Sequence, residues 1–241
     1  MSAFSRFILI VCVLAATAVL ACLGAWQVQR LQWKEALIAD VTARVKSPPS
    51  TLPEMAVQYA ETGDVDYAPV SLSGTFDHSR ELYFFTTHEG QSGWSVFTPL
   101  VLDSGNVALV NRGFVPAQLK DPALRQQGQS AGKVTITGLA RNPLFEKPNS
   151  MIPDNDVAQR QFFWKSMGDM ALAAGLEPDA LVPFFIDADA TENPGGWPRG
   201  GTTIVSFPNN HLQYAITWFG LAIACLGVGG WFLFSSRHGR A

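Results

Sequence analysis

A histidine stands directly before an uncharged segment near the C-terminus, in the run PNNHLQYAITWFGLA at residues 208–222. The stretch from Tyr214 to Phe234 carries no charged side chain, and its 21 residues allow a helix to cross the roughly 30 Å hydrocarbon core of a bilayer. We therefore expect His211 to lie where a membrane helix meets water. An imidazole at this depth can ligate a metal or a haem iron from one side.

Aromatic side chains follow His211 at helical spacing. Residues three, four and seven positions further along a helix share a face, so Tyr214, Ala215 and Trp218 fall on one stripe with His211. Two aromatic rings beside an imidazole can form a flat wall for a porphyrin. A histidine with aromatic neighbours also anchors helices at membrane interfaces without any ligand, and composition alone favours that simpler role.

A second uncharged run, residues 7–26, begins behind Arg6 and closes with Trp26. Its 20 residues exceed the roughly 7–15 of a secretory signal core, so a membrane span is favoured over a cleaved signal peptide. Small residues that permit close helix packing recur every four positions in both runs. They are Thr17, Ala21 and Ala25 in the first run, and Gly220 and Ala224 in the second. If the two helices pair, Trp26 and Arg30 reach the level of His211.

The segment between the two runs, residues 27–213, is large enough to form one domain with its own core. It holds all 20 acidic residues and 14 of the 17 basic ones, a formal charge of −6. Nucleic acid is therefore excluded as an expected partner. The three cysteines, Cys12, Cys22 and Cys225, all lie in the apolar runs, so the domain can form neither a disulfide of its own nor a thiolate metal site.

The pattern after Trp26 predicts that the first helix continues to about residue 46, where Pro48 and Pro49 end it. Short β-branched and aromatic runs separated by turn residues then predict strands. The expected strands are Tyr67–Phe76, Glu81–Thr87, Trp94–Leu102, Val107–Phe114, Lys133–Ala140, Gln161–Lys165, Phe184–Asp187 and Thr202–Phe207, and the clearest helix is Met167–Leu176. The expected fold is a membrane protein whose two transmembrane helices flank a mainly antiparallel β domain, a small barrel or sandwich, with one or two helices.

Enzymatic motifs are missing from the sequence. His78 and His88 have no partner at metal-binding spacing, and there is no GxSxG turn, no GxGxxG and no Walker pattern. We therefore expect no catalytic residue and no enzyme activity. Arg112, in the NRGF segment, either satisfies backbone carbonyls or contacts a partner.

Charge around the second helix predicts the orientation in the membrane. Arg237 and Arg240 follow the helix, which favours a cytoplasmic C-terminus and, with two spans, a cytoplasmic N-terminus. The expected organisation is a cytoplasmic N-terminus at 1–6, a first span at 7–26, an extracytoplasmic β domain with its helical extension at 27–213, a second span at 214–234 and a cytoplasmic tail at 235–241.

Four segments together resemble the Surfeit locus protein 1 family of cytochrome c oxidase assembly factors. They are GAWQVQRLQWK at residues 24–34, GWSVFTPL at 93–100, VNRGFVP at 110–116 and NNHLQYAITWF at 209–219. The resemblance spans nearly the whole chain. It implies a two-helix membrane protein that assists maturation of haem-copper oxidases, with bacterial members implicated in binding haem a and delivering it to the catalytic subunit.

On this resemblance, His211 is the expected axial ligand of the haem iron. Tyr214 and Trp218 would form the porphyrin wall. The expected membrane depth, rather than the resemblance, adds Trp26 as a second aromatic contact and Arg30 as a partner for a propionate. The expected partners are the catalytic subunit of the oxidase and the haem a synthesis machinery. The start of the chain has no Arg-rich, Ser-rich transit segment, so we expect the bacterial inner membrane, with the domain in the periplasm. A scaffold that stabilises an oxidase assembly intermediate without binding haem is the alternative.

Overall fold

The computed structural model describes residues 2–238 and divides into two compact units. The first joins residues 1–41 to residues 206–241 and is helical, and the second, residues 42–205, holds the strands. The compact domain is thus shorter at both ends than the expected 27–213, although the membrane boundaries themselves stay a prediction. Within the expected tail, residues 239–241, and Arg240 with them, lie outside the described residues.

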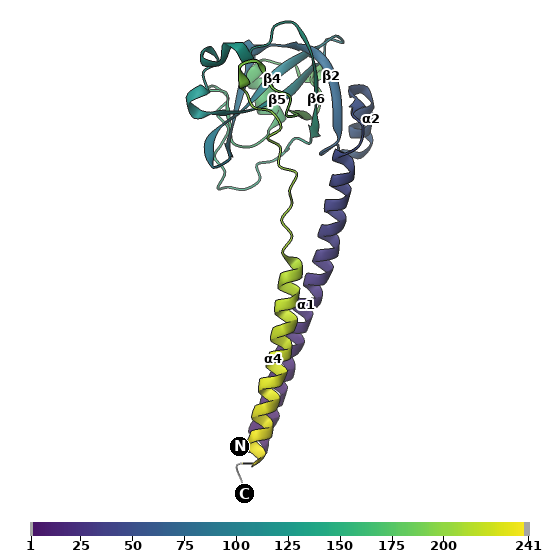
Figure 1. Cartoon of the computed structure of the whole chain (residues 1–241), viewed down its shortest axis with the longest axis vertical. Coiled ribbons are helices and arrows are strands. Elements are labelled where there is room, and N and C mark those ends of the chain that lie inside the picture. The colour runs from purple at the N-terminus through teal and green to yellow at the C-terminus, as the bar shows by residue number, and fades with distance from the viewer. Residues whose placement is uncertain (1, 239–241) are drawn as a thin grey trace. The chain divides into compact units, whose positions relative to one another are not determined.

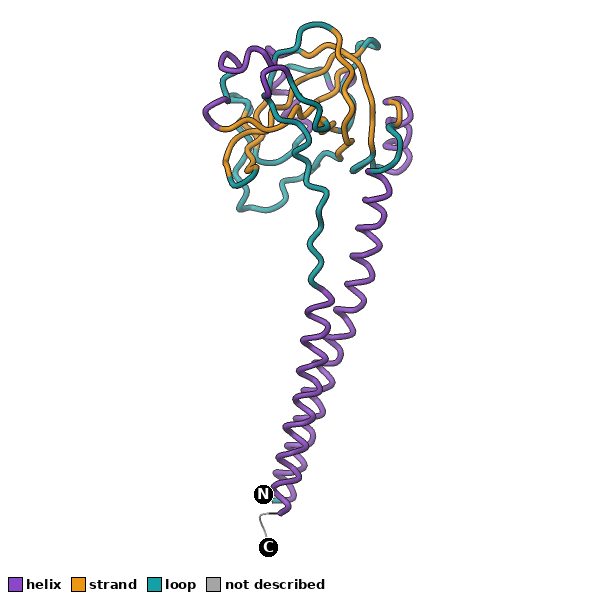
Figure 2. Tube along the Cα trace, in the orientation of Figure 1, coloured by secondary structure: helices purple, strands orange, loops and turns teal. Residues whose placement is uncertain are grey.

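Two long helices make up the first unit. Helix α1 spans Ala3–Val45 without interruption, and helix α4 spans His211–His238. Each contains a segment long and apolar enough to cross a membrane. The two helices run side by side in opposite directions (Figures 1 and 2). Their apolar parts are in contact, with Gly24 against Phe219 and Gly229 against Val13. The continuation of α1 to Val45, just short of Pro48, confirms the expected helical extension.

Small residues line the contact between α1 and α4. Gly24 is buried, and a methyl group added there would lie 2.7 Å from the ring of Phe219. Ala215 and Ala222 on α4 are also buried. Gly220 faces open space, so its expected place in the contact is wrong, whereas Ala224 lines a hollow shared by α1 and α4.

The second unit is built on a closed barrel. Its strands are β2 (Pro69–Phe76), β4 (Gln91–Leu102), β5 (Val107–Pro116), β6 (Lys133–Arg141) and β8 (Phe185–Ala188). They pair in the order β2–β6–β8–β5–β4, and β4 returns to β2 through the register Thr75 to Val101. Four of the strands are labelled in Figure 1. All barrel pairings are antiparallel except β5–β8, so the expected mainly antiparallel barrel is confirmed.

Strand β4 extends beyond the barrel into a second layer. A register shift between Ser95 and Phe97 bends it, as a bulge does, and its first half pairs with β3 (Leu82–His88), which pairs in turn with β7 (Gln161–Phe162). Helix α3 (Met167–Ala174) contributes Met170 to the small core beneath this layer. The main core fills the barrel, with Val70, Leu100 and Ile186 fully buried.

Seven of the eight expected strands are confirmed, with ends shifted by a few residues. The expected strand Thr202–Phe207 is wrong: this segment has no regular structure and is drawn as a loop in Figure 2. The segment is tied to the barrel by a side chain: the hydroxyl of Thr203 donates a hydrogen bond to the carboxylate of Asp187. Its backbone joins no strand. Helix α2 (Leu52–Thr62), which follows the two-residue strand β1 (Ser50–Thr51), was not expected.

Short 3-10 helices occupy the long loops of the domain. They are η1 (His78–Arg80), η2 (Ala117–Leu119), η3 (Pro122–Gly128), η4 (Pro178–Ala180) and η5 (Pro194–Gly196). Of these, η1, η3 and η5 flank the buried end of the barrel where polar side chains gather.

Candidate functional site

His211 is the first residue of α4, and its side chain faces α1. The backbone amide of His211 donates to Oδ1 of Asn209 at 3.3 Å, which satisfies one of the free amides at the start of the helix. The ring Nδ1 lies 2.7 Å from Oε1 of Gln27 on α1. Gln27 is 8% exposed and His211 is half-buried. The imidazole therefore points into the contact between the two helices.

The contact with Gln27 selects one tautomer of the ring. An amide oxygen only accepts hydrogen bonds, so Nδ1 of His211 carries the proton and donates it to Oε1. Nε2 has no hydrogen-bond partner among residues 2–238. An imidazole held by a hydrogen bond at one nitrogen, with its other nitrogen free, is the arrangement that proteins use for metal ligation.

The other expected site residues surround His211 less tightly. Trp218 is half-buried, whereas Tyr214 and Trp26 are 54% and 51% exposed. Arg30 is exposed and its guanidinium stacks over the ring of Trp33, 4.3 Å from the centroid. Gln27 and the half-buried Trp218 thus lie close to the contact between the helices. The rings of Tyr214 and Trp26 and the guanidinium of Arg30 lie on the outside of the helix pair.

A haem with one protein ligand fits this donor set, while a metal ion held by protein side chains alone does not. Within the described residues there is no group of three or more histidine, cysteine or carboxylate side chains that could hold a metal. Sequence reasoning missed Gln27. The signal was present, because an amide inside an apolar helix, one residue after Trp26, needs a polar partner on a neighbouring helix.

A cluster of charged side chains is buried inside the β domain, and sequence reasoning missed it as well. Glu81, Arg112 and Arg125 are each at most 5% exposed. Arg125 on η3 binds both carboxylate oxygens of Glu81, and Arg112 on β5 places Nη1 3.7 Å from the same carboxylate. The ring of His78 lies 3.6 Å from Glu81. One carboxylate is therefore shared by two guanidinium groups.

The surroundings of this cluster shift its pKa values. Burial acts to raise the pKa of Glu81, but hydrogen bonds from His78 and Arg125 and the charges of both arginines outweigh it, so the pKa of Glu81 lies below its usual value. Burial lowers the pKa of Arg112 to about 10. Burial and the nearby charge of Glu81 raise the pKa of Tyr83 to about 12. At neutral pH, Glu81 and Arg112 are thus charged.

Asp187 on β8 is the centre of a second buried polar group. It accepts hydrogen bonds from Asn111 at 2.9 Å and Thr203 at 2.8 Å, and Arg141 and Lys165 each lie 3.5 Å away. Burial acts to raise its pKa, but Lys165, Asn111 and Arg141 together lower it below the usual value. These contacts join three barrel strands to the segment that leads to α4.

The sequence matches a known protein family. The model of the SURF1 family matches residues 14–223, which include most of α1, the whole β domain and the first part of α4. The chain belongs to the SURF1 family. It is 39% identical to Surfeit locus protein 1 of Homo sapiens over 219 residues, which cover 84% of this chain and 70% of the human one. This SURF1 family chain is therefore a membrane protein with two apolar helices flanking a β domain.

More distant relatives keep the same extent of similarity. Surfeit locus protein 1 of Rattus norvegicus is 38% identical over 84% of this chain and 68% of its own length. A SURF1-like protein of Drosophila melanogaster is 29% identical over 84% of this chain and 70% of its own length. Each alignment covers 84% of this chain, more than the β unit alone, so the similarity is not confined to one unit.

Proposed function

We propose that this chain assists the assembly of a haem-copper cytochrome c oxidase by binding haem a and passing it to the catalytic subunit. The observation that supports this most directly is the hydrogen bond between Nδ1 of His211 and Gln27, which leaves Nε2 as an unpartnered ligating atom at the entry to the membrane helix. Membership of the SURF1 family supports the link to oxidase assembly.

In this proposal the residues of the chain have distinct roles. His211 holds the iron through Nε2, and Gln27 fixes the orientation and tautomer of its ring. Trp218, Tyr214 and Trp26 offer apolar aromatic surface to the porphyrin. When bound, the haem would supply an iron for transfer to the recipient protein.

Arg30 is proposed to pair with a haem propionate. Its guanidinium is exposed above Trp33, so it keeps several N–H donors available for a carboxylate. Binding a propionate would not require Arg30 to leave this stacked position, because a guanidinium donates in its plane and stacks through its face.

We also propose the orientation that the arginines after α4 favour, with the β domain outside the cytoplasm and, in a bacterial cell, in the periplasm of the inner membrane. The opposite directions of α1 and α4 bring the start of α1, at Ala3, and the end of α4, at His238, to one side of the membrane. A C-terminal fusion to green fluorescent protein, which does not fold into its fluorescent form when exported unfolded, should fluoresce. A dark fusion with normal membrane levels would reverse the assignment.

The haem proposal is tested by purifying the full chain in detergent from cells that make haem a. The wild-type protein should show a haem absorption spectrum, and His211→Ala should lose it. Gln27→Leu should keep bound haem with a shifted spectrum, because the ligand remains while its orienting bond is gone. A His211→Ala protein with the wild-type spectrum would remove this residue from the role.

The scaffold alternative is favoured by the same interhelical bond, because a hydrogen-bonded histidine and glutamine pair can simply lock two membrane helices together. On that alternative, His211→Ala and Gln27→Leu should loosen the helix pair equally, and neither protein should carry haem at any stage. Oxidase activity in cells should then follow the amount of folded protein alone.

A further inference from the structure

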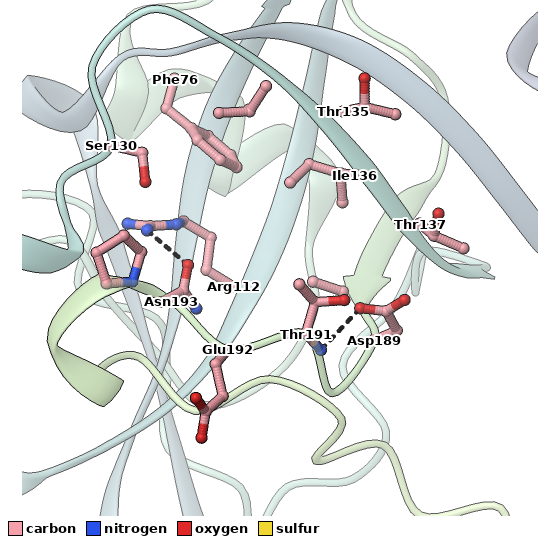
Figure 3. A pocket seen from close by; sticks show the side chains of 13 residues that line it. Phe76, Arg112, Ser130, Thr135, Ile136, Thr137, Asp189, Thr191, Glu192 and Asn193 are labelled. Carbon is pink, nitrogen blue, oxygen red and sulfur yellow. Dashed lines mark hydrogen bonds between the residues drawn. The ribbon is translucent and has the colours of Figure 1, made fainter.

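A small cavity in the β domain has the side chain of Arg112 in its wall, as Figure 3 shows. Its volume is about 210 Å³, below the roughly 300–1,000 Å³ of pockets that take drug-sized ligands. Hydroxyl groups of Ser130, Thr137 and Thr191 share the lining with the apolar side chains of β6. The cavity therefore suits a small polar molecule, and it is too small for a porphyrin.

The charges behind this cavity do not balance. Arg112 and Arg125 share the single carboxylate of Glu81, which leaves one buried positive charge in excess. Two carboxylates lie at the rim of the cavity. Figure 3 shows that the carboxylate of Glu192 points away from Arg112, and that of Asp189 accepts from the backbone amide of Thr191 at 2.9 Å. Neither rim carboxylate pairs with the guanidinium.

Arg112 also has an unused hydrogen-bond donor. Its side chain is 2% exposed, and Nη2 donates to the carbonyl of Gly128 and to Oδ1 of Asn193 at 3.0 Å. Nη1 lies 3.4 Å from the ring of His78. Nε is buried and has no hydrogen-bond partner within residues 2–238. A buried donor without an acceptor is uncommon in folded proteins, and an absent ion or ligand is one physical reason for it.

We propose that this cavity binds a small oxyanion, a carboxylate or a phosphate, with the guanidinium of Arg112 as its counter-charge. Hydrogen bonds between a guanidinium and an oxyanion are charge-assisted and strong in a buried setting. The hydroxyl of Ser130 points toward the guanidinium in Figure 3 and supplies a further donor. Phe76 packs its ring 4.8 Å from the guanidinium carbon and holds its plane in place.

The excess charge agrees with the electrostatics of the cluster. Burial lowers the pKa of Arg112 to about 10, against the raising effect of Glu81. An oxyanion in the cavity would favour the protonated guanidinium and raise this pKa again. The cavity lies wholly within the β domain, so the proposal is independent of haem binding at His211.

The test is isothermal titration of the full chain in detergent with inorganic phosphate and, separately, with succinate, at constant ionic strength set with sodium chloride. We expect saturable binding of at least one of them. The anion that binds more tightly shows whether the cavity prefers a phosphate or a carboxylate. Saturable binding of neither would overturn the proposal.

Two variants locate the binding. Ser130→Phe puts a ring beside the guanidinium and should weaken binding by about tenfold or more, the loss expected for one charge-assisted hydrogen bond. Ser104→Phe, the same change in the exposed β4–β5 turn, should bind as the wild type. Arg112→Lys keeps the charge but lacks the planar fork, and it should also weaken binding if it folds. Wild-type affinity in a folded Ser130→Phe protein would overturn the proposal, whatever the result for Arg112→Lys.

Discussion

Replacing Glu81 by Gln should destabilise the β domain more than any single change to the arginines around it. At an effective dielectric constant of about 20, a unit charge pair at 3–4 Å attracts by roughly 4–5 kcal/mol. The carboxylate of Glu81 lies 3.1 Å from Nη1 of Arg125 and 3.7 Å from Nη1 of Arg112, so its removal forfeits two such attractions. It also leaves two cations buried side by side.

The net cost is smaller than the summed attraction, because the glutamate no longer has to be desolvated. Breaking a buried ion pair by removing one partner typically costs about 3–5 kcal/mol, and Glu81→Gln should lie at the upper end. For a domain of this size, about 4 kcal/mol lowers the melting temperature by roughly 8–16 °C. Arg125→Met should cost about half as much, because Glu81 then still pairs with Arg112.

Urea unfolding of the full chain in detergent, followed by tryptophan fluorescence, measures these differences. The control is Asp103→Asn, which breaks an exposed ion pair with Lys133 and should cost less than about 1 kcal/mol. The reasoning is refuted if Glu81→Gln costs no more than this control, or if Arg125→Met is the more damaging change.

The same variant has a defined pH dependence. Because the pKa of Glu81 is lower in the folded domain than its ordinary value of 4.5, its contribution is fully present above that value and is lost as the pH falls through the folded pKa. The stability gap between the wild type and Glu81→Gln should therefore be constant near neutrality and narrow only below pH 4.5. A gap that closes between pH 8 and 6 would place the effect on another group.

Three further changes test separate parts of the fold. Gly113→Ala should lower the free energy of unfolding in urea by more than about 2 kcal/mol. Gly113 has a φ of +119°, and the added methyl would lie 1.9 Å from a backbone carbonyl oxygen. Gly105→Ala, at φ +87° in open space, should lower it clearly less. Ser166→Ala should cost about 1 kcal/mol in the same assay, since its hydroxyl accepts from the third amide of α3; no loss would mean that water replaces this cap. Gly24→Leu should separate α1 from α4 and lower the thermal midpoint of the helical circular dichroism in detergent, and Gly220→Leu, in open space, should not.

Local patterns were enough to predict most of the fold. Lys133–Arg141 alternates apolar and polar residues, and it forms the expected strand with Val134 and Ile136 packed against the core. The segment Thr202–Phe207 has equally β-branched residues, yet it forms no strand. A strand requires a free neighbouring edge as well as suitable residues, and the barrel is already closed by β2 and β4. Helix α2 was missed although Pro53 near its start and Gly63 at its end are helix signals.

The candidate sites were less predictable, because their residues are distant in the sequence. His211 was found from its position before an apolar run, but Gln27, its partner, lies 184 residues away. Glu81 and Arg125 are 44 residues apart, and Arg125 sits in a polar loop that reads as solvent-exposed. Arg112 inside the apolar strand β5 was the one signal of a buried charge in the sequence. Its ion-pair partner, Glu81, can be identified only from the three-dimensional structure of the barrel.

The order of the elements along the chain bears on how this protein is made. In the described residues the last strand of the barrel ends at Ala188, well before α4 begins at His211. Ribosomes synthesise the chain from its N-terminus, so every barrel strand is made before the second helix is translated. The domain can thus close while only α1 is anchored, and the late contacts of Thr203 with Asp187 would then draw the segment before the second anchor onto a finished barrel.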